Sequence, residues 1–266
     1  MLFFMNVVCD SECIVEFFGV TRVNIIGKCR KALNISFALN LLWLRALRLG
    51  VAASIEHKSV LRNLHACTVI DIGANRGQFA LVARLAFPTA KIISFEPLPK
   101  PAALFRRVFA RDDVVVLHVA AIGPTSGQCA MHVSGRDDSS SLLPISALQE
   151  KIFPGTSEVG TVAVHVAPLD TFINEEDIVA PAMLKLDVQG FELDALQGCE
   201  SLLSKFEWVY CECSFVELYS GQKLAADVIS WLSDKGFRVK GIYNPAYDSE
   251  GQAIQADFLF QYIGME

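Results

Sequence analysis

Four acidic residues stand at or near the ends of apolar runs that are typical of β-strands: Asp71, Glu96, Asp187 and Glu212. A carboxylate in such a position can accept hydrogen bonds from hydroxyl or ammonium groups, or take up a proton as a general base. In an open α/β sheet, ligands bind beyond the carboxyl ends of the strands. The four acids therefore mark a candidate ligand site.

The first acid leads into a turn with two glycines, in the stretch TVIDIGANRGQFALV from Thr68 to Val82. Gly73 and Gly77 let the backbone turn and approach a ligand without a Cβ in the way. The helix expected next offers free N–H groups and the positive end of its dipole. Asn75 stands between the glycines, so the Gly-x-Gly of the dinucleotide fingerprint is absent. Because Asp71 would repel a phosphate and suit an ammonium group, S-adenosylmethionine fits better than a nucleotide phosphate.

Glu96 supports the same ligand. It ends the next strand-like run, in IISFEPLP, 23 residues after Gly73. A carboxylate there can accept two hydrogen bonds from a ribose diol. The acid–glycine turn followed by this glutamate predicts S-adenosylmethionine as the cofactor. Two alternatives stay open, a nicotinamide or other nucleotide as the ligand and a non-catalytic binding protein on the same fold.

Strand-like and helix-like segments alternate from Cys67 onward. The expected strands are CTVIDI, KIISFE, VVVLHVA, AMLKLDV, EWVYCEC, FRVKGIY and ADFLFQY, with helices over residues 77–87, 98–110, 191–205 and 223–236. Most of the strand runs are apolar throughout, as expected for strands that are covered on both faces. This alternation predicts a Rossmann-like, doubly wound α/β sheet in a domain of residues 56–266. Residues 1–55 are expected to form an N-terminal helical extension.

One segment breaks the alternation. GQCAMHV and GTVAVHVAPL are expected to pair as an inserted β-hairpin, with a polar, turn-rich stretch between them. Long connections above the carboxyl edge of a sheet usually form a binding site or a cover, so we expect residues 134–166 to be a partly mobile cover. The serines of this stretch offer hydroxyls to a polyol or belong to a plain flexible loop, and the two histidines of the hairpin are expected to be half-exposed rather than catalytic. These residues are Ser139, Ser140, Ser141, His132 and His165.

The composition excludes several classes of protein. With 266 residues, 52% hydrophobic and 20% charged, the chain is expected to be globular and to bury a large core. A net charge of -6 argues against a nucleic-acid partner, and the arginines at 106, 107 and 111 are expected to form a solvated helix face. Eight cysteines without a CxxC pair indicate a reducing, cytoplasmic compartment rather than a zinc site.

The N-terminal region is not expected to be an export signal or a membrane-spanning segment. MLFFMNVV lacks a basic flank and is soon followed by acids, which makes a poor signal peptide. The uncharged stretch from Ala32 to Leu44 is too short for a spanning helix, which needs about 20 residues. We expect a helix packed on the domain or on a second subunit of a homodimer. Peripheral contact with a membrane is the alternative that its flanking basic residues leave open.

The chain resembles the FkbM-type methyltransferase family over residues 67–262. The resemblance rests on VIDIGANRGQF, SFEPLP, VAAIG, SSSLL, VAPLDTFI, MLKLDVQGFELDALQG and VYCECSF. It implies a class I methyltransferase fold with a seven-stranded, mostly parallel sheet whose last strand is antiparallel. It also implies O-methylation, generally of hydroxyls on saccharides or natural products. Ala120 of VAAIG is assigned to the cofactor site, next to Val119, which stands where the family often has asparagine near the adenine.

The sequence also nominates residues for the transfer step. Methyl transfer to oxygen is an in-line displacement, in which a positioned base helps a poorly nucleophilic alcohol. Asp187 and Glu212 are the candidates, while Lys185 at i−2 on the same strand face offers Asp187 a purely structural pairing. Glu192 is expected to brace the start of the following helix. A divalent metal on the two candidates is an alternative that no spacing demands, so no metal is predicted. The stretch LDVQGFE stands where methyltransferases that act on the amino groups of adenine or glutamine resemble each other in an Asn/Asp-Pro-Pro-Tyr/Phe turn.

Overall fold

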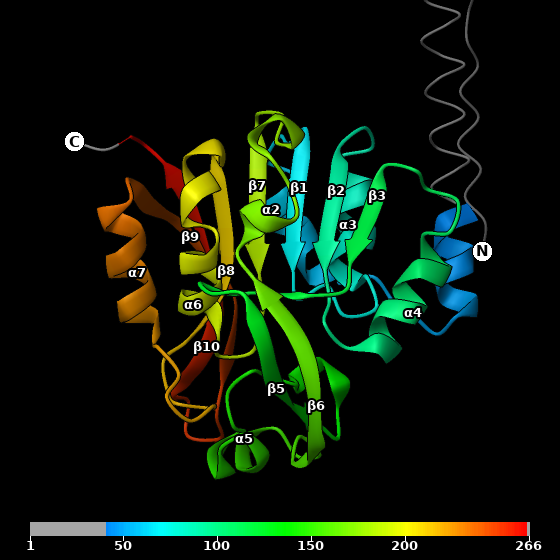
Figure 1. Cartoon of the computed structure of the whole chain (residues 1–266). Coiled ribbons are helices and arrows are strands. Elements are labelled where there is room, and N and C mark those ends of the chain that lie inside the picture. The colour runs from blue at the N-terminus through cyan, green and yellow to red at the C-terminus, as the bar shows by residue number, and fades with distance from the viewer. Residues whose placement is uncertain (1–40, 265–266) are drawn as a thin grey trace, which may run out of the picture. The chain divides into compact units, whose positions relative to one another are not determined.

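A seven-stranded sheet forms the centre of the molecule, in a computed structural model that describes residues 41–264 (Figure 1). The strand order is β3-β2-β1-β7-β8-β10-β9. The bounds are β1 Thr68–Ile72, β2 Lys91–Phe95, β3 Val115–His118, β7 Ala182–Leu186, β8 Trp208–Ser214, β9 Phe237–Tyr247 and β10 Ala253–Tyr262. β10 runs antiparallel to both of its neighbours, while the other pairs are parallel. The predicted sheet with an antiparallel last strand is confirmed.

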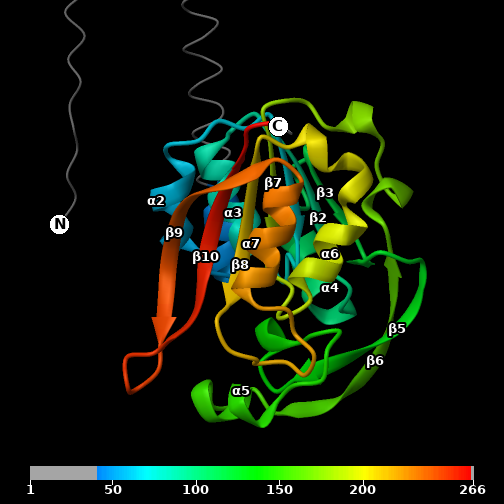
Figure 2. The same cartoon turned by 90° about the vertical axis from the view of Figure 1, so that its left-hand side faces the viewer.

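Helices cover both faces of this sheet (Figure 2). The bounds are α2 Lys58–Leu61, α3 Gln78–Ala86, α4 Pro99–Val108, α6 Glu192–Gly198 and α7 Ala225–Asp234. One buried cluster joins the sheet to α3 and α4, and another joins it to α6 and α7. The core therefore has two layers, one on each face of the sheet. Packing on both faces holds in place the strand ends that carry the predicted acids.

The helix predicted over residues 191–205 is wrong in its second half. α6 ends at Gly198, and a 3-10 turn, η5, follows from Glu200 to Lys205. A Cβ on Gly198 would lie 2.6 Å from the carbonyl of Gly123, so glycine is needed for this close approach. Glycine weakens a helix interior, and here it coincides with the end of the α-helix.

The N-terminal prediction falls mostly outside the described residues, which belong to one compact unit beginning at Leu41. Residues 41–48 are helical, and η1 spans Ile55–His57. Leu42 and Ala46 are buried in the cluster that contains α3. The boundary after residue 55 stays a prediction. From residue 41 to 264, no helix is both long and apolar enough to span a membrane.

The inserted segment (residues 121–167) lies beyond the carboxyl edge of the sheet, at the bottom of Figure 1. It contains a three-stranded sheet in the order β4-β6-β5. Its bounds are β4 Ala121–Ile122, β5 Gly127–Ser134, η2 Asp137–Ser139, α5 Ala147–Ile152 and β6 Glu158–Ala167. β5 and β6 pair antiparallel as predicted, and β4 adds a short parallel pairing that was not predicted. Two 3-10 turns, η3 Leu169–Thr171 and η4 Glu175–Asp177, lead back to β7.

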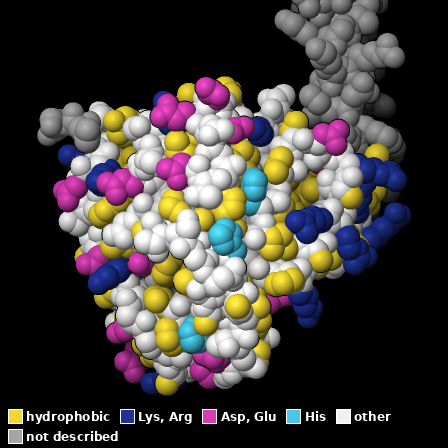
Figure 3. Space-filling view, viewed as in Figure 1, with side chains coloured by type: hydrophobic (Ala, Val, Ile, Leu, Met, Phe, Trp, Pro, Cys, Tyr) yellow, Lys and Arg dark blue, Asp and Glu magenta, His cyan; other side chains and the backbone are white. Residues whose placement is uncertain are grey.

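The surface charge is uneven. Lysine and arginine side chains gather on the side of the molecule that carries α4 (Figure 3), where Arg106, Arg107 and Arg111 are exposed. None of the three makes an ion pair with a described residue. Their exposure agrees with the predicted solvated surface, although only Arg106 and Arg107 lie on α4 and Arg111 follows its end.

Candidate active site

A cavity of about 390 Å³ lies between the carboxyl edge of the sheet and the inserted segment. The glycine turn and the end of β2 form one side, and the ends of β7, β8 and β10 form the other. Its lining includes Gly73, Asn75, Glu96, Ala120, Asp187 and Glu212 among the predicted residues, together with His57, Gln149, Gln189, Asn244, Gln255 and Asp257. The cavity therefore brings together most of the predicted site and a polar wall that was not predicted.

Strand pairing sets three carboxylates side by side at this edge. Glu212 of β8 and Asp257 of β10 are direct partners. Lys185 pairs with Tyr210, and Asp187 and Glu212 each follow two residues later on their chains. Since side chains alternate along a strand, residues two apart share a face. Asp187, Glu212 and Asp257 thus form a row on one face, across three adjacent strands.

The glycines of the turn are required by close packing. Gly73 has φ +81° and Gly77 has φ +92°, which favour glycine. A Cβ on Gly73 would overlap the carbonyl oxygen of Asp187, and a Cβ on Gly77 would lie 2.6 Å from the ring of Phe109. Gly73 borders the cavity, whereas Gly77 does not. Gly77 therefore supports the turn from behind, and only Gly73 is placed for a close approach by a ligand.

The N–H groups of the turn before α3 are already used within the protein. Those of Gly73 and Ala74 donate to the carbonyl of Phe95 at 3.0 and 2.9 Å. That of Asn75 donates to Glu96 Oε2 at 2.9 Å. The turn thus presents side chains and a bare Cα to the cavity rather than a nest of amides.

Glu96 is held in place by the backbone at the end of β2. Its Oε1 accepts a hydrogen bond from the N–H of Leu98 at 2.7 Å, and its Oε2 accepts the one from Asn75. Burial raises the pKa of Glu96 from 4.5 to about 7, although these two amides oppose the rise. Each carboxylate oxygen has a second lone pair, which leaves acceptor capacity for a diol. The buried Oδ1 of Asn75 has no hydrogen-bond partner within residues 41–264 and is a second acceptor beside it.

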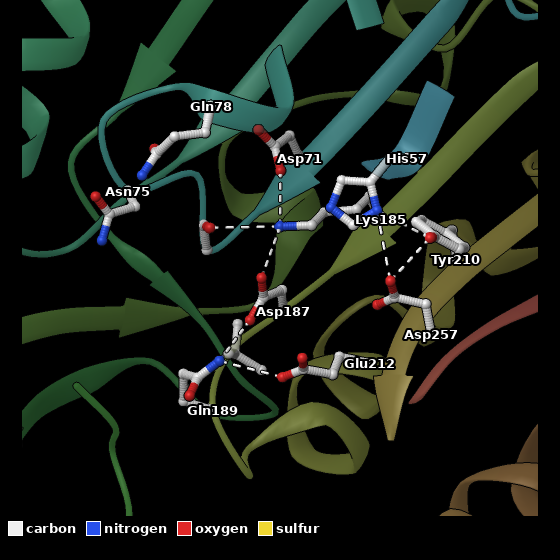
Figure 4. Close-up of polar contacts among 12 residues, drawn as sticks. His57, Asp71, Asn75, Gln78, Lys185, Asp187, Gln189, Tyr210, Glu212 and Asp257 are labelled. Atoms are coloured by element: carbon white, nitrogen blue, oxygen red, sulfur yellow. Dashed lines mark hydrogen bonds and ion pairs between the residues drawn. The ribbon is translucent and has the colours of Figure 1, made fainter. Parts of the chain in front are cut away.

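Asp71 lies behind the cavity and not on its wall, which corrects its expected direct contact with a ligand. Its carboxylate is fully buried and pairs with Lys185 Nζ at 3.3 Å (Figure 4). The same ammonium lies 3.5 Å from Asp187 Oδ2 and 3.5 Å from the carbonyl of Gly73. Burial raises the pKa of Asp71 in spite of Lys185, and burial lowers the pKa of Lys185 less than the two carboxylates raise it. Asp71 therefore acts on the cavity through Lys185.

Gln189, which the sequence did not single out, links the two predicted catalytic acids. Its Nε2 donates to Asp187 Oδ1 at 2.7 Å and to Glu212 Oε2 at 3.2 Å. Gln255 Nε2 donates to the other oxygen of Glu212 at 2.6 Å. Burial, followed by the charges of Asp187 and Asp257, raises the pKa of Glu212 well above its usual value. Glu212 is therefore better suited to hold a proton and hydrogen-bond a ligand than to act as a base.

The turn that carries Gln189 is braced from two sides. Glu192 Oε1 accepts hydrogen bonds from the N–H groups of Val188 and Gly190, both at 3.1 Å, so it braces the helix start as predicted. Burial raises the pKa of Glu192 to about 7. Tyr219 OH donates to Gln189 Oε1 at 2.7 Å. These contacts hold Gln189 at φ +56°. This left-handed backbone conformation costs free energy for any residue other than glycine.

The inserted segment closes the cavity through polar contacts. Arg76 of the glycine turn pairs with Asp137 of η2 at 2.6 Å. Ser141 Oγ donates to the carbonyl of Gln189 at 2.6 Å, so this hydroxyl is not free for an acceptor. Gln149 of α5 is buried on the cavity wall, and its Oε1 has no partner in the described part of the chain. The segment therefore contributes both a closure and an unused hydrogen-bond acceptor.

The remaining candidates on the insert are placed as follows. Ser139 and Ser140 line the cavity, and both are buried. His132 and His165 do not line the cavity. His132 Nδ1 lies 2.8 Å from Glu158 Oε2, and the ring of His165 packs against that of Phe172 with 5.9 Å between the ring centres. Across residues 41–264, no group of three or more histidine, cysteine or acidic residues is arranged to hold a metal ion.

A cluster around His57 completes the polar wall and was missed by sequence reasoning. His57 Nδ1 lies 2.9 Å from Tyr210 OH and 3.4 Å from Asp257 Oδ2 (Figure 4). Tyr210 OH and Asn244 Nδ2 donate to the same Asp257 oxygen, at 2.9 and 2.8 Å. These residues come from four separate parts of the chain. The only signal in the sequence was an acid inside the strand-like run ADFLFQY.

Comparison with known proteins identifies the family. A model of the methyltransferase FkbM domain matches residues 71–239. The 2-O-methyltransferase NoeI of Sinorhizobium fredii is 30% identical over 160 residues, which cover 58% of this chain and 66% of that protein. The 31-O-demethyl-FK506 methyltransferase FkbM of Streptomyces tacrolimicus is 25% identical over 202 residues, which cover 67% and 75%. A solved precorrin-6y C5,15-methyltransferase from Geobacter metallireducens has a TM-score of 0.42 at 12% identity, over 77% of this chain and 87% of that one.

The cavity fits the cofactor that this family implies. Gly73 leaves room where any side chain would meet Asp187. Glu96 and the unpartnered Oδ1 of Asn75 supply acceptors for hydroxyl or ammonium groups, and the carboxylates of Asp187 and Asp257 suit a cationic ligand. The family model covers more than half of the chain. This chain therefore belongs to the FkbM methyltransferase family and is an S-adenosylmethionine-dependent methyltransferase.

Proposed function

We propose that the chain transfers a methyl group from S-adenosylmethionine to a hydroxyl of a saccharide or natural-product acceptor. The observation that carries this proposal is the polar wall opposite the glycine turn. It combines the acids Asp187 and Glu212 with the amides of Gln149, Gln189 and Gln255. Carboxylates and amides together offer both donors and acceptors, which a polyhydroxylated molecule needs. NoeI is named a 2-O-methyltransferase and FkbM a 31-O-demethyl-FK506 methyltransferase, and both names favour oxygen as the atom methylated.

The cofactor side of the cavity would be formed by Gly73, Asn75, Glu96 and Ala120. Glu96 accepts from the ribose hydroxyls, and Asn75 offers its unpartnered Oδ1 to a donor of the ligand. Ala120 gives the adenine a small apolar contact, because it is buried and borders the cavity. When bound, S-adenosylmethionine supplies an activated methyl group on a positively charged sulfur.

Asp187 and Glu212 are assigned to the acceptor. Gln189 fixes both carboxylates through one amide nitrogen, so an acceptor hydroxyl that bonds them is held in a defined direction. Orientation of this kind supplies a large part of the acceleration in a displacement at an activated carbon. Lys185 holds Asp187 from behind. The inserted segment excludes water from the reacting groups.

The test is methyl transfer from methyl-labelled S-adenosylmethionine to a panel of methyl pyranosides and polyketide alcohols, each beside its amino analogue. We expect a methyl ether and one equivalent of S-adenosylhomocysteine for at least one hydroxyl acceptor. Asp187→Asn should lower the rate with that acceptor, whereas Asp113→Asn, at an exposed site away from the cavity, should not. Binding of the cofactor without methylation of any hydroxyl, or transfer to nitrogen alone, would refute the proposal.

A further inference from the structure

A short segment, residues 54–57, precedes the region matched by the family model and lies at one end of the cavity. The N–H of Ser54 donates to the carbonyl of Gln78 at 3.1 Å, which attaches the segment to the start of α3. The ring of His57 packs edge-on against Phe79 at 5.4 Å. Residues 54, 56 and 57 line the cavity, although the match to the family model begins only at residue 71. The segment thus adds an imidazole to the site from outside the matched region.

One side of this imidazole is held by a buried carboxylate. His57 Nδ1 faces Tyr210 OH and Asp257 Oδ2, and Tyr210 and Asn244 both donate to that oxygen. Burial acts to raise the pKa of Asp257, but the hydrogen bonds from His57, Asn244 and Tyr210 outweigh it and lower the pKa. An ionised Asp257 stabilises a proton on the imidazole and fixes the ring in one orientation.

The other side of the imidazole is open. His57 Nε2 makes no hydrogen bond to any residue from 41 to 264, and it is not among the side-chain atoms sealed from solvent without a partner. Its nearest charged neighbour is the exposed carboxylate of Glu56, at 3.9 Å. Asp257 is the direct strand partner of Glu212, so the imidazole lies beside the acids assigned to the acceptor. Nε2 is therefore a nitrogen without a hydrogen bond, on a residue that lines the cavity.

We propose that His57 is the general base of methyl transfer and that Asp257 orients it, an inference that rests on the proposed O-methylation. The acceptor oxygen forms a bond to the methyl carbon as the carbon–sulfur bond breaks, and the sulfur keeps the electron pair. The proton of the acceptor hydroxyl passes to His57 Nε2, and the imidazolium is balanced by Asp257. Asp187 and Glu212 position the acceptor, since Asp187 is engaged by Lys185 and Gln189.

The charges around His57 favour this role. Glu56 belongs to its own segment, Tyr210 faces it from β8 and Asp257 from β10. Asp71 of β1 acts on it from farther away, and Lys185 of β7 lies over the same Phe79 ring that His57 packs against. Asp71 and Lys185 offset each other as an ion pair. The excess charge facing the imidazole is therefore negative, which stabilises the protonated product of base catalysis.

The position of Nε2 can be tested without an acceptor. Diethylpyrocarbonate carbethoxylates accessible imidazole nitrogens, and mass spectrometry reads each histidine separately. In the complex with S-adenosylhomocysteine we expect His57 to be modified, since its Nε2 makes no hydrogen bond and the proposal places it at the acceptor. Exposed His65 serves as the positive control for reactivity. A His57 that stays unmodified while His65 reacts would overturn the proposal, because a base must be reachable from the acceptor site.

The role in transfer is tested on the best hydroxyl acceptor of the wild-type enzyme. His57→Gln retains a side chain that can bond Tyr210 and Asp257, and we expect its kcat to fall at least about a hundredfold, as is typical for loss of a general base. Its affinity for S-adenosylhomocysteine should stay within about threefold, and the acid limb of the kcat–pH profile should disappear. Added imidazole should restore part of the activity of His57→Ala. His65→Gln should match the wild type in every measurement.

The outcomes separate the two proposals. If the wild type methylates a hydroxyl and His57→Gln keeps its kcat and its acid limb, His57 holds only the segment on the sheet and this inference is wrong. If the kcat of His57→Gln falls only because the variant loses folded protein, thermal melting shows this loss. The test then rests on the folded fraction of His57→Ala: restoration of activity by imidazole supports the proposal, and no restoration contradicts it. If the wild type binds the cofactor but methylates no hydroxyl, the proposed function fails and the inference fails with it.

Discussion

The carbonyl oxygen of Asp187 occupies the space into which any side chain at Gly73 would project. The first residue after β7 and the first glycine after β1 are therefore packed backbone against Cα, where the proposed cofactor and acceptor sides of the cavity meet. This contact couples the glycine turn to the residue that we assign to the acceptor. A change at one should be felt at the other.

Gly73→Ala should therefore unfold the protein more easily and impair the site. An alanine at φ +81° costs about 1–3 kcal/mol, and the overlap with Asp187 adds to this cost. Urea unfolding measures the loss. Gly127→Ala is the matched control, because nothing lies within 4 Å of its Cβ and its φ is not positive. Equal stability of the two variants would show that the close approach at Gly73 is not required.

Lys185→Met should be strongly destabilising. Removing one partner of a buried ion pair typically costs about 3–5 kcal/mol, because the remaining charge is left uncompensated. Asp71 is fully buried and has Lys185 as its charged partner. The double variant with Asp71→Asn should recover a large part of the loss in free energy of unfolding. If the double variant is as unstable as Lys185→Met alone, the pair is not the reason for the loss.

Glu192 should make stability depend on pH. Its pKa of about 7 in the folded protein, against 4.5 as its ordinary value, means that the folded state binds the proton more tightly. Stability from this group is complete below pH 4.5 and is lost as the pH rises through 7, by about 3 kcal/mol at about 1.4 kcal/mol per pKa unit.

Glu192→Gln should therefore flatten the fall in melting temperature between pH 5 and pH 8, while keeping an acceptor for Val188 and Gly190. Glu96 should leave some pH dependence behind, since its pKa is also about 7. Exposed Glu207→Gln is the control and should melt like the wild type at each pH. An unchanged pH dependence in Glu192→Gln would mean that this carboxyl titrates normally.

Ser141→Ala should separate binding from transfer. The hydroxyl ties the inserted segment to the carbonyl of Gln189, which in turn holds Asp187 and Glu212. We expect the cofactor affinity to stay within about threefold and the methyl-transfer rate to fall by about tenfold or more, as a misplaced acceptor requires. Ser126→Ala, at an exposed site outside the cavity, should change neither quantity. A rate equal to that of the wild type would contradict the closing role of the segment.

Local signals in the sequence predicted the sheet, the glycine turn and the placing of Glu96 and Asp187. Each of these depends on a few consecutive residues, such as an apolar run that ends in an acid. The direct contact expected of Asp71 depended instead on its neighbour across the sheet. Asp71 and Lys185 lie on paired strands that are far apart in the chain, and only the strand order shows that they neutralise each other.

The cluster at His57 was beyond the sequence for the same physical reason. β10 inserts between β8 and β9, and this places Asp257 beside Glu212. His57 then reaches Asp257 from a segment 200 residues earlier. No periodicity in the chain encodes that meeting, because it arises from long-range packing. The end of α6 at Gly198 was missed likewise, since the close approach to Gly123 is a tertiary contact.

Calorimetry on the wild type and on Glu96→Ala measures whether the glycine turn and Glu96 form the cofactor site. We predict that S-adenosylmethionine and S-adenosylhomocysteine bind the wild type, and that binding tightens from pH 6 to pH 8 as Glu96, with a pKa of about 7, becomes ionised. Glu96→Ala should weaken the binding free energy by about 1–3 kcal/mol and abolish the pH dependence of binding that this carboxylate causes. Glu207→Ala should change neither the binding free energy nor its pH dependence. No binding of either compound at millimolar concentration, with binding of NAD instead, would contradict the assignment of this cavity.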